Sequence, residues 1–194
     1  MNRHSHVRRG LLAAVAATAA FFLLQAAWIP AKAELAQVLL WRAWAQTRAD
    51  GQPHRPWPWA DTWPVAVLRA DRFGIRQAIL DGASGRNLAF GPVALPGNGD
   101  GSRDWVLSAH RDTHFAWLRD VRQGERLVIE TRAGRRAYRV TGMDIVDSRE
   151  SVLVRDATAD RLTLVTCWPF DALDPGGPLR YVVTALPERD SARG

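Results

Sequence analysis

The chain has 194 residues, of which 47% are apolar and 24% charged, as expected for one folded domain with extensions. The formal net charge of +6 is uneven: residues 1–60 carry seven basic and two acidic side chains, whereas residues 61–194 carry nineteen basic and eighteen acidic ones. A nucleic-acid-binding domain concentrates positive charge on its folded surface, so this distribution argues against that function. The single cysteine, Cys167, excludes an internal disulfide.

The first thirty residues have the pattern of a membrane anchor. Arg3, Arg8 and Arg9 precede an uncharged run over residues 11–29, which as a helix is about 28 Å long, close to the hydrocarbon thickness of a bilayer. Basic residues ahead of the run predict a cytoplasmic N-terminus and an exported remainder. Residues 31–33 (AKA) have the form of a signal-peptide cleavage site. The run is longer than an ordinary signal sequence, which favours an uncleaved anchor.

Two segments follow the anchor. Residues 31–49 are rich in helix formers with apolar residues at helical spacing, which predicts an amphipathic helix ended by Asp50-Gly51. Residues 52–64 contain four prolines and three tryptophans. The prolines predict no regular element there, and the tryptophans predict a strap packed against the folded domain.

From residue 65 the pattern is typical of short strands separated by turns, and residues 111–121 are expected to hold a short helix. Many short strands with few helices predict a mainly β fold, in the form of a closed or partly open barrel. The predicted strands are 65–70, 75–80, 105–109, 126–131, 136–141, 143–146, 161–166 and 181–186.

Three chemically useful side chains lie at the ends of these predicted strands. His110 ends the run WVLSAH, Cys167 ends RLTLVTC, and Arg180 begins another apolar run. A nucleophile, an acid/base group and a permanent cation at strand ends predict a cysteine active site on a β scaffold. The alternative is that Cys167 is a small buried hydrophobe with no chemical role.

A zinc site built from His110, His114 and Cys167 is a weaker hypothesis. The two histidines have the spacing of ligands on one helix face, but the glutamate of an HExxH motif is replaced by Arg111. A cation beside a metal ligand is unfavourable. We therefore expect no metal and no cofactor, and we interpret His114 as a surface or loop residue.

Three segments together resemble the sortases, a family of cysteine transpeptidases. They are SAHRDT at 108–113, TLVTC at 163–167 and LRYVV at 179–183, and their order along the chain agrees with that family. The resemblance implies a sortase-like closed β-barrel of about eight strands with short helices, preceded by a transmembrane helix. The implied division is 1–9 cytoplasmic, 10–30 transmembrane, 31–56 helical and proline-rich linker, and 57–190 catalytic barrel.

Further segments are similar to the sortases of Gram-negative proteobacteria, which serve one dedicated substrate. They are the strap PWPWADTWP, LAFGP at 88–92 and CWPFDA at 167–172. The histidine segment departs from the GHR found in many members, because here it is SAHR. The chain has no long acidic loop of the calcium-regulated kind, so we expect no calcium dependence.

The resemblance implies a role for each of the three residues. Cys167 attacks a peptide carbonyl and holds the acyl group as a thioester, His110 exchanges protons with the amines, and Arg180 stabilises the oxyanion. Thr166, Trp168 and Asp112 are candidate substrate-binding residues. Asp112 either orients His110 or, as we prefer, caps the next helix. Trp168 either lines the substrate groove or packs beneath a loop.

The function implied is a membrane-anchored transpeptidase that cleaves a C-terminal LPxTG-like sorting signal and transfers the acyl group to an amine acceptor. Its partners would be a substrate protein, the acceptor and inner-membrane lipid, and not nucleic acid. The catalytic domain would face the periplasm from a single-pass anchor in the inner membrane. Two alternatives remain: a cysteine endopeptidase that uses water as acceptor, and a non-enzymatic β-barrel binding module of the envelope.

Overall fold

The computed structural model describes residues 3–82, 84–96, 98, 101–152, 156, 158–172 and 176–188, with only the backbone for residues 3–11, 27 and 29. The chain divides into two compact units, residues 1–38 and 39–194. One long helix, α1 (Arg3–Asp50), contributes to both units. The strands are β1 (Pro64–Ala70), β2 (Ile75–Asp81), β3 (Val93–Ala94), β4 (Asp104–Ser108), β5 (Arg126–Thr131), β6 (Gly134–Asp147), β7 (Arg161–Cys167) and β8 (Leu179–Pro187).

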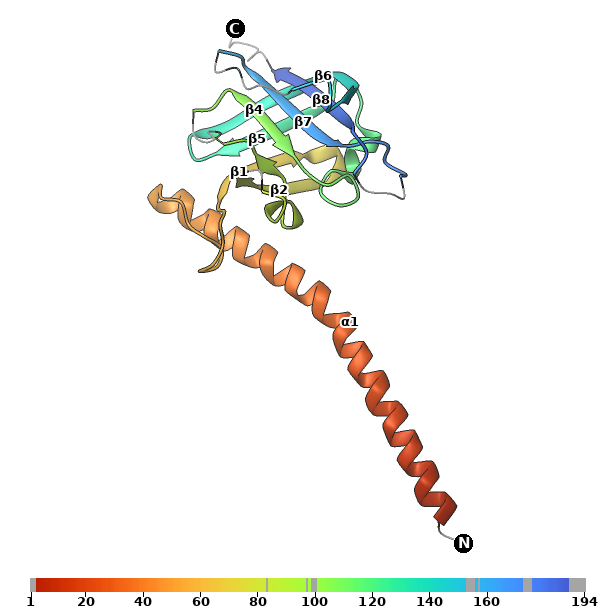
Figure 1. Cartoon of the computed structure of the whole chain (residues 1–194). Coiled ribbons are helices and arrows are strands. Elements are labelled where there is room, and N and C mark those ends of the chain that lie inside the picture. The colour runs from red at the N-terminus through yellow and green to blue at the C-terminus, as the bar shows by residue number, and fades with distance from the viewer. Residues whose placement is uncertain are drawn as a thin grey trace. The chain divides into compact units, whose positions relative to one another are not determined.

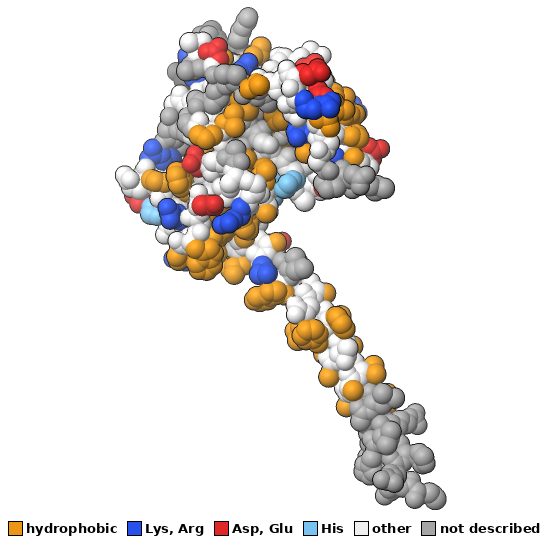
Figure 2. All heavy atoms as spheres, in the orientation of Figure 1, with side chains coloured by type: hydrophobic (Ala, Val, Ile, Leu, Met, Phe, Trp, Pro, Cys, Tyr) orange, Lys and Arg blue, Asp and Glu red, His pale blue; other side chains and the backbone are white. Residues whose placement is uncertain are grey.

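The two helices predicted for residues 10–30 and 31–49 form one continuous helix. Pro30 lies inside α1, where it removes one backbone hydrogen bond without ending the helix. Alanine and leucine dominate both sides of this position, and their high helix propensity favours continuation. Exposed apolar side chains cover the described part of the helix before residue 39 (Figure 2). By length and composition α1 is a candidate membrane span.

The last turns of α1 belong to the second unit and pack there. Leu40 is fully buried against Leu80 of β2 and Val93 of β3. The guanidinium of Arg76 lies 4.0 Å from the centre of the Trp41 ring. The helix ends at Asp50 as predicted, because Gly51 follows with φ +80° and donates its N–H to the carbonyl of Thr47.

The segment between α1 and β1 has no regular element and packs as a strap, as predicted. Trp57 makes an edge-to-face contact with Phe90 at 4.9 Å between ring centres. Thr62 is buried, and its hydroxyl donates to the carbonyl of Asp81. Trp59 differs from the prediction, since it is 80% exposed.

The eight strands form a closed barrel in the order β1-β2-β3-β4-β7-β8-β6-β5. Figure 1 shows β4, β7, β8 and β6 side by side across one wall. The pairs β2–β3 and β4–β7 are parallel and the others antiparallel. Alternate residues of each strand face the interior, where large side chains such as Trp105, Phe115 and Tyr138 are completely or almost completely buried. The prediction of a closed barrel of about eight strands is confirmed.

The observed strands differ from the predicted ones at two places. The predicted strands 136–141 and 143–146 are one strand, β6, whose register against β8 shifts between Val140 and Gly142. The shift is a bulge, which bends a strand without ending it, so the glycine was mistaken for a turn. The strand β3 was missed because two residues are too few to form a periodic pattern.

The predicted short helix within 111–121 is a 3₁₀-helix, η3 (Ala116–Asp120). Its N-cap residue is Phe115, which makes no side-chain capping bond. The preferred interpretation of Asp112 as the cap of this helix is therefore wrong. Residues 111–115 instead form a turn that ends in a hydrogen bond from the N–H of Phe115 to the carbonyl of His110.

The close approach of Gly91 to β2 leads to a stability prediction. A Cβ atom at this position would lie 2.9 Å from the carbonyl oxygen of Ala78, a backbone atom that has little room to move. Gly91→Ala is expected to lower the free energy of unfolding by about 1–3 kcal/mol, measured by denaturant titration. Gly85→Ala is the control, since nothing lies within 4 Å of its Cβ. Equal stabilities of the two variants would contradict the prediction.

Candidate active site

Cys167 is the last residue of β7 and lies on the outer face of the barrel wall. Leu162 and Leu164 of this strand belong to the interior core, whereas Val165 belongs to a separate apolar cluster. Because side chains alternate along a strand, Cys167 shares the outer face with Val165. The cysteine is half-buried, so the thiol is not locked inside the core. This placement contradicts the interpretation of Cys167 as a fully buried hydrophobe.

The parallel pairing of β4 with β7 brings His110 beside Cys167. Ser108 pairs with Val165, and the backbone contact continues where the N–H of Ala109 donates to the Val165 carbonyl at 3.3 Å. The register of β4 and β7 ends at this pair, and His110 follows Ser108 by two residues, as Cys167 follows Val165. Continuation of the same register would set the two residues opposite one another, about 5 Å apart at the usual strand spacing. The side chain of His110 is exposed.

The antiparallel pairing of β7 with β8 places Arg180 directly opposite Cys167 on the other side. The Nη1 atom of Arg180 donates to the carbonyls of Gly177 and Leu179, at 2.6 and 2.9 Å. These bonds hold the guanidinium at the start of β8. Its Nε and Nη2 atoms make no hydrogen bond to the described residues, so they remain available as donors.

An apolar strip continues from the three residues along the same outer face. Val106, Val165 and Val182 lie on the adjacent strands β4, β7 and β8 and are buried against one another. Leu95 and Val146 pack on the strip as partly buried neighbours. The cysteine, histidine and arginine therefore stand at the end of an apolar surface that follows the direction of the strands.

Thr166 faces the opposite side of β7 from Cys167. Its buried hydroxyl donates to the carbonyl of Ala109 at 2.8 Å. The bond ties the residue before the cysteine to the residue before the histidine. The structure thus places Thr166 behind the surface that carries the thiol, where it holds β7 against the end of β4.

Trp168 is part of an aromatic cluster that packs against the barrel core. Its ring lies 5.7 Å from that of Tyr181 and 5.6 Å from that of Phe170, measured between ring centres. The three rings, together with Arg119 and Asp171, line a cavity of about 450 Å³. The packing interpretation of Trp168 thus agrees with its contacts, while its indole also borders an open space.

Arg111, which stands where an HExxH motif has glutamate, links two segments near the candidate site. It is buried, and its Nη2 atom donates to the carbonyl of Ala172 at 2.8 Å. Its Nε atom donates to the carboxylate of Asp112 at 3.3 Å. Arg111 therefore joins the turn after His110 to the segment after Cys167. A charged residue beside a candidate catalytic histidine was the available signal, but its long-range partner could not be read from the sequence.

His114 lies in the turn after His110, as expected for a loop residue, but it is half-buried. Burial is the main cause that lowers the pKa of His114; a bond to the carbonyl of Ala89 opposes the shift, and the charge of His110 adds to it. His114 is therefore neutral at pH 7.

The closed eight-stranded barrel carries Cys167 opposite Arg180 on neighbouring strands, and His110 lies two residues beyond the last pair that joins β4 to β7. Residues 68–188 match the family described as "Sortase domain", so the chain belongs to the sortase family, whose members are cysteine transpeptidases. The match begins in β1 and includes all three residues.

Individual relatives agree with this assignment. Sortase D of Bacillus subtilis is 32% identical over 79 residues, which are 40% of this chain and 39% of that protein, so the aligned part spans well under half of the relative. The sortase D5 transpeptidase of Clostridium perfringens has a similar fold, with a TM-score of 0.64 at 14% identity, over 80% of this chain and 99% of that one. Listeria monocytogenes sortase A has a TM-score of 0.56 at 18% identity, over 65% and 88% of the two chains.

Proposed function

We propose that the protein is a membrane-anchored transpeptidase that cleaves a C-terminal LPxTG-like sorting signal and joins the new carboxyl end to an amine. The observation that supports the proposal is the pairing of Cys167 with Arg180, with His110 two residues beyond the last pair of β4 and β7. The catalytic residues would be these three. The partners would be a substrate protein, an amine acceptor and inner-membrane lipid.

The chemistry would proceed through a thioester. The Cys167 thiolate attacks the scissile carbonyl carbon, and the Arg180 guanidinium donates to the resulting oxyanion. The C–N bond then breaks as the His110 imidazolium gives its proton to the leaving amine. An incoming amine attacks the thioester and loses its proton to His110, and the thiolate leaves. One difficult amide exchange becomes two easier steps.

The apolar strip of Val106, Val165 and Val182 is the surface on which the signal peptide would lie. An extended peptide presents alternate side chains to a sheet surface, so apolar residues of the signal would contact the valines. The polar backbone around the scissile bond would then reach Cys167 and Arg180 at the end of the strip.

The anchor α1 would cross the inner membrane once, with the N-terminus cytoplasmic and the catalytic barrel in the periplasm. Three N-terminal arginines and the apolar composition of residues 11–29 support this orientation. The similarity to sortases of Gram-negative proteobacteria, and with it a single dedicated substrate, stays a prediction based on the strap and on CWPFDA.

Product analysis tests the proposal against its alternatives. The full chain in detergent is mixed with a panel of peptides that end in LPxTG-like signals, with triglycine as the amine, and the products are identified by mass spectrometry. A product extended by triglycine, and a hydroxamate when hydroxylamine replaces triglycine, are expected. A carboxylate product alone, in excess amine, would indicate an endopeptidase. Uncleaved peptides together with a thiol inert to alkylation would indicate a binding module.

Arg111 is expected to position His110 relative to Cys167. Arg111→Gln removes the bond to Ala172, and the two segments would separate slightly, so kcat is expected to fall about tenfold or more with little change in KM. The measurement is steady-state transpeptidation, with the pH dependence of Cys167 alkylation as a second readout that a purely structural role would not shift.

Arg119→Gln is the matched control for Arg111. Arg119 also donates to a carbonyl of the segment after the cysteine, that of Phe170 at 3.4 Å, but it lies farther along the chain from His110. A variant Arg111→Gln with normal kcat and an unshifted alkylation profile would show that the residue does not position the site.

A further inference from the structure

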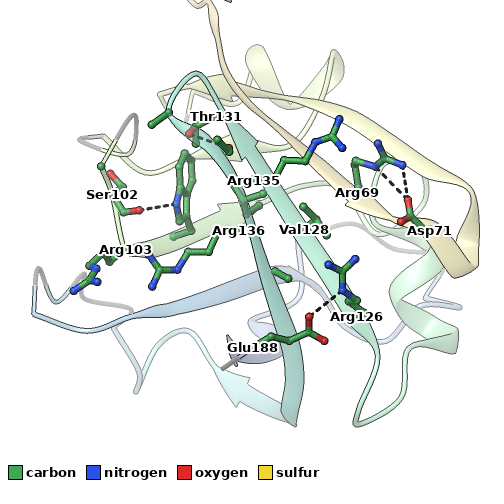
Figure 3. A pocket seen from close by; sticks show the side chains of 16 residues that line it. Arg69, Asp71, Ser102, Arg103, Arg126, Val128, Thr131, Arg135, Arg136 and Glu188 are labelled. Atoms are coloured by element: carbon green, nitrogen blue, oxygen red, sulfur yellow. Dashed lines mark hydrogen bonds and ion pairs between the residues drawn. The ribbon is translucent and has the colours of Figure 1, made fainter. Parts of the chain in front are cut away.

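A further cavity is remote from the candidate active site. It has a volume of about 860 Å³ and is formed by β1, β5, β6 and the loop before β4 (Figure 3). The loop precedes the start of β4, whereas Cys167 ends the parallel neighbour β7, so about 20 Å of strand separates them. We call this cavity the arginine pocket. Its charged lining residues are Arg69, Arg103, Arg126, Arg135 and Arg136, with Asp71 and Glu188.

Positive charge exceeds negative charge around the arginine pocket even when every ion-pair partner is counted. Each of three carboxylates contacts two arginines, while Arg69 and Asp71 pair one to one. The sharing groups are Glu130 with Arg48 and Arg135, Asp160 with Arg103 and Arg136, and Glu188 with Arg126 and Arg139. Among the described residues, one arginine of each group thus has no carboxylate of its own. Such an excess is local, because residues 61–194 are nearly neutral.

The arginines at the mouth of the pocket retain unused donors. Arg126 and Arg135 each bind their carboxylate through Nε, at 2.9 and 3.2 Å, and no other side-chain bond of theirs is found among the described residues. Their side chains are 52% and 65% exposed. Both residues line the arginine pocket, Arg135 near Arg69 and Arg126 near Glu188 (Figure 3). Their terminal nitrogens can therefore bind an anion without breaking the existing pairs.

Two polar atoms on the interior face of β6, one of them from the lining residue Arg136, are buried. The Nε atom of Arg136 and the hydroxyl of Tyr138 have no hydrogen-bond partner among the described residues. Burial raises the pKa of Tyr138 to about 12, and the charges of Arg136, Asp160 and Arg103 also act on it. The hydroxyl thus remains protonated at physiological pH and keeps its capacity to donate a hydrogen bond.

We propose that the arginine pocket binds a phosphate or pyrophosphate group. A guanidinium matches phosphate oxygens with two parallel donors, and it does so without loss of charge at any physiological pH. Three uncompensated positive charges fit a multiply charged anion better than a single carboxylate. The same phosphate chemistry occurs in a free anion and in a phospholipid headgroup, and the experiment separates these two sources.

Calorimetric titration of the full chain in uncharged detergent tests the proposal. The probes are inorganic phosphate, pyrophosphate, dihexanoyl phosphatidylglycerol and, as a zwitterionic comparison, dihexanoyl phosphatidylcholine. Saturable binding of at least one of the first three is expected, and the double variant Arg126→Gln/Arg135→Gln should weaken it about a hundredfold, roughly tenfold for each arginine. Both carboxylates keep a second arginine in this variant, so the fold should persist.

The double variant Arg122→Gln/Arg149→Gln is the control, because it removes the same net charge from exposed positions outside the pocket. It should bind the probes like the unaltered chain. Binding of the inorganic anions would identify a free phosphate, and binding of phosphatidylglycerol alone a headgroup; both support the proposal. No saturable binding, or equal weakening in the two double variants, would overturn it. Sorting peptides are absent, so the result does not depend on the proposed transpeptidation.

Discussion

Cys167→Ala is expected to lower the rate of transpeptidation by at least roughly 10⁴-fold, because no other thiol in the chain can form the acyl intermediate. The half-buried cysteine is small, so its replacement by alanine should leave the unfolding transition almost unchanged. The measurement is the rate of triglycine-linked product, together with the loss of the hydroxamate formed in hydroxylamine.

Thr184→Ala is the matched control for the cysteine variant. Thr184 lies on β8 on the same outer face as Arg180, and its side chain is partly buried like that of Cys167. Its replacement should leave turnover within about twofold, as for an ordinary surface position. Residual product in Cys167→Ala at the wild-type level would remove the thioester from the proposed mechanism.

Arg180→Gln is expected to lower kcat by about 10²–10³-fold, since it removes a charged donor from the developing oxyanion. Arg180→Lys keeps the charge but loses the planar fork, so an intermediate rate is expected. The bonds from Arg180 to the carbonyls of Gly177 and Leu179 also hold the segment that leads into β8. A rise in KM in these variants would show that this segment contributes to substrate binding. The measurement is steady-state kinetics with the best peptide of the panel.

Arg149→Gln is the control for the arginine variants. Arg149 is 72% exposed and binds Asp147, where its hydrogen bonds are the main cause that lowers the pKa of that carboxyl to about 2. The variant removes one positive charge near Arg180 without removing the guanidinium opposite Cys167. Equal losses of kcat in Arg149→Gln and Arg180→Gln would mean that only general electrostatics matters at this position.

Most strands of the barrel could be predicted because they alternate apolar and polar residues between turn residues. Residues 126–131 were predicted with the observed bounds, and most other strands within a few residues. The prediction failed where local pattern and pairing disagree. Gly142 has the appearance of a break, yet β8 continues to pair with β6 on both sides of it. Pro30 likewise predicts a break that the flanking helix formers override.

The candidate site, too, was only partly predictable from the sequence. His110, Cys167 and Arg180 were identified from their positions at strand ends, whereas the contribution of Arg111 was not. Its partner, the carbonyl of Ala172, is 61 positions away. Every residue has a backbone carbonyl, so the sequence does not indicate which one accepts the bond. The preferred role of Asp112 was wrong because η3 begins only at Ala116, with Phe115 as its N-cap residue.

The sequence by itself determined the candidate catalytic side chains, their order along the chain, and the β-rich character of the domain, because these depend on residue identity and short-range periodicity. Only the tertiary structure decided that the strands leading to His110 and Cys167 are neighbours, since the parallel pairing of β4 with β7 joins strands that are separated by two others in the chain. The arginine pocket arises for the same reason. Its charges are scattered through the sequence and gather only when the closed barrel brings β1, β5 and β6 to one surface.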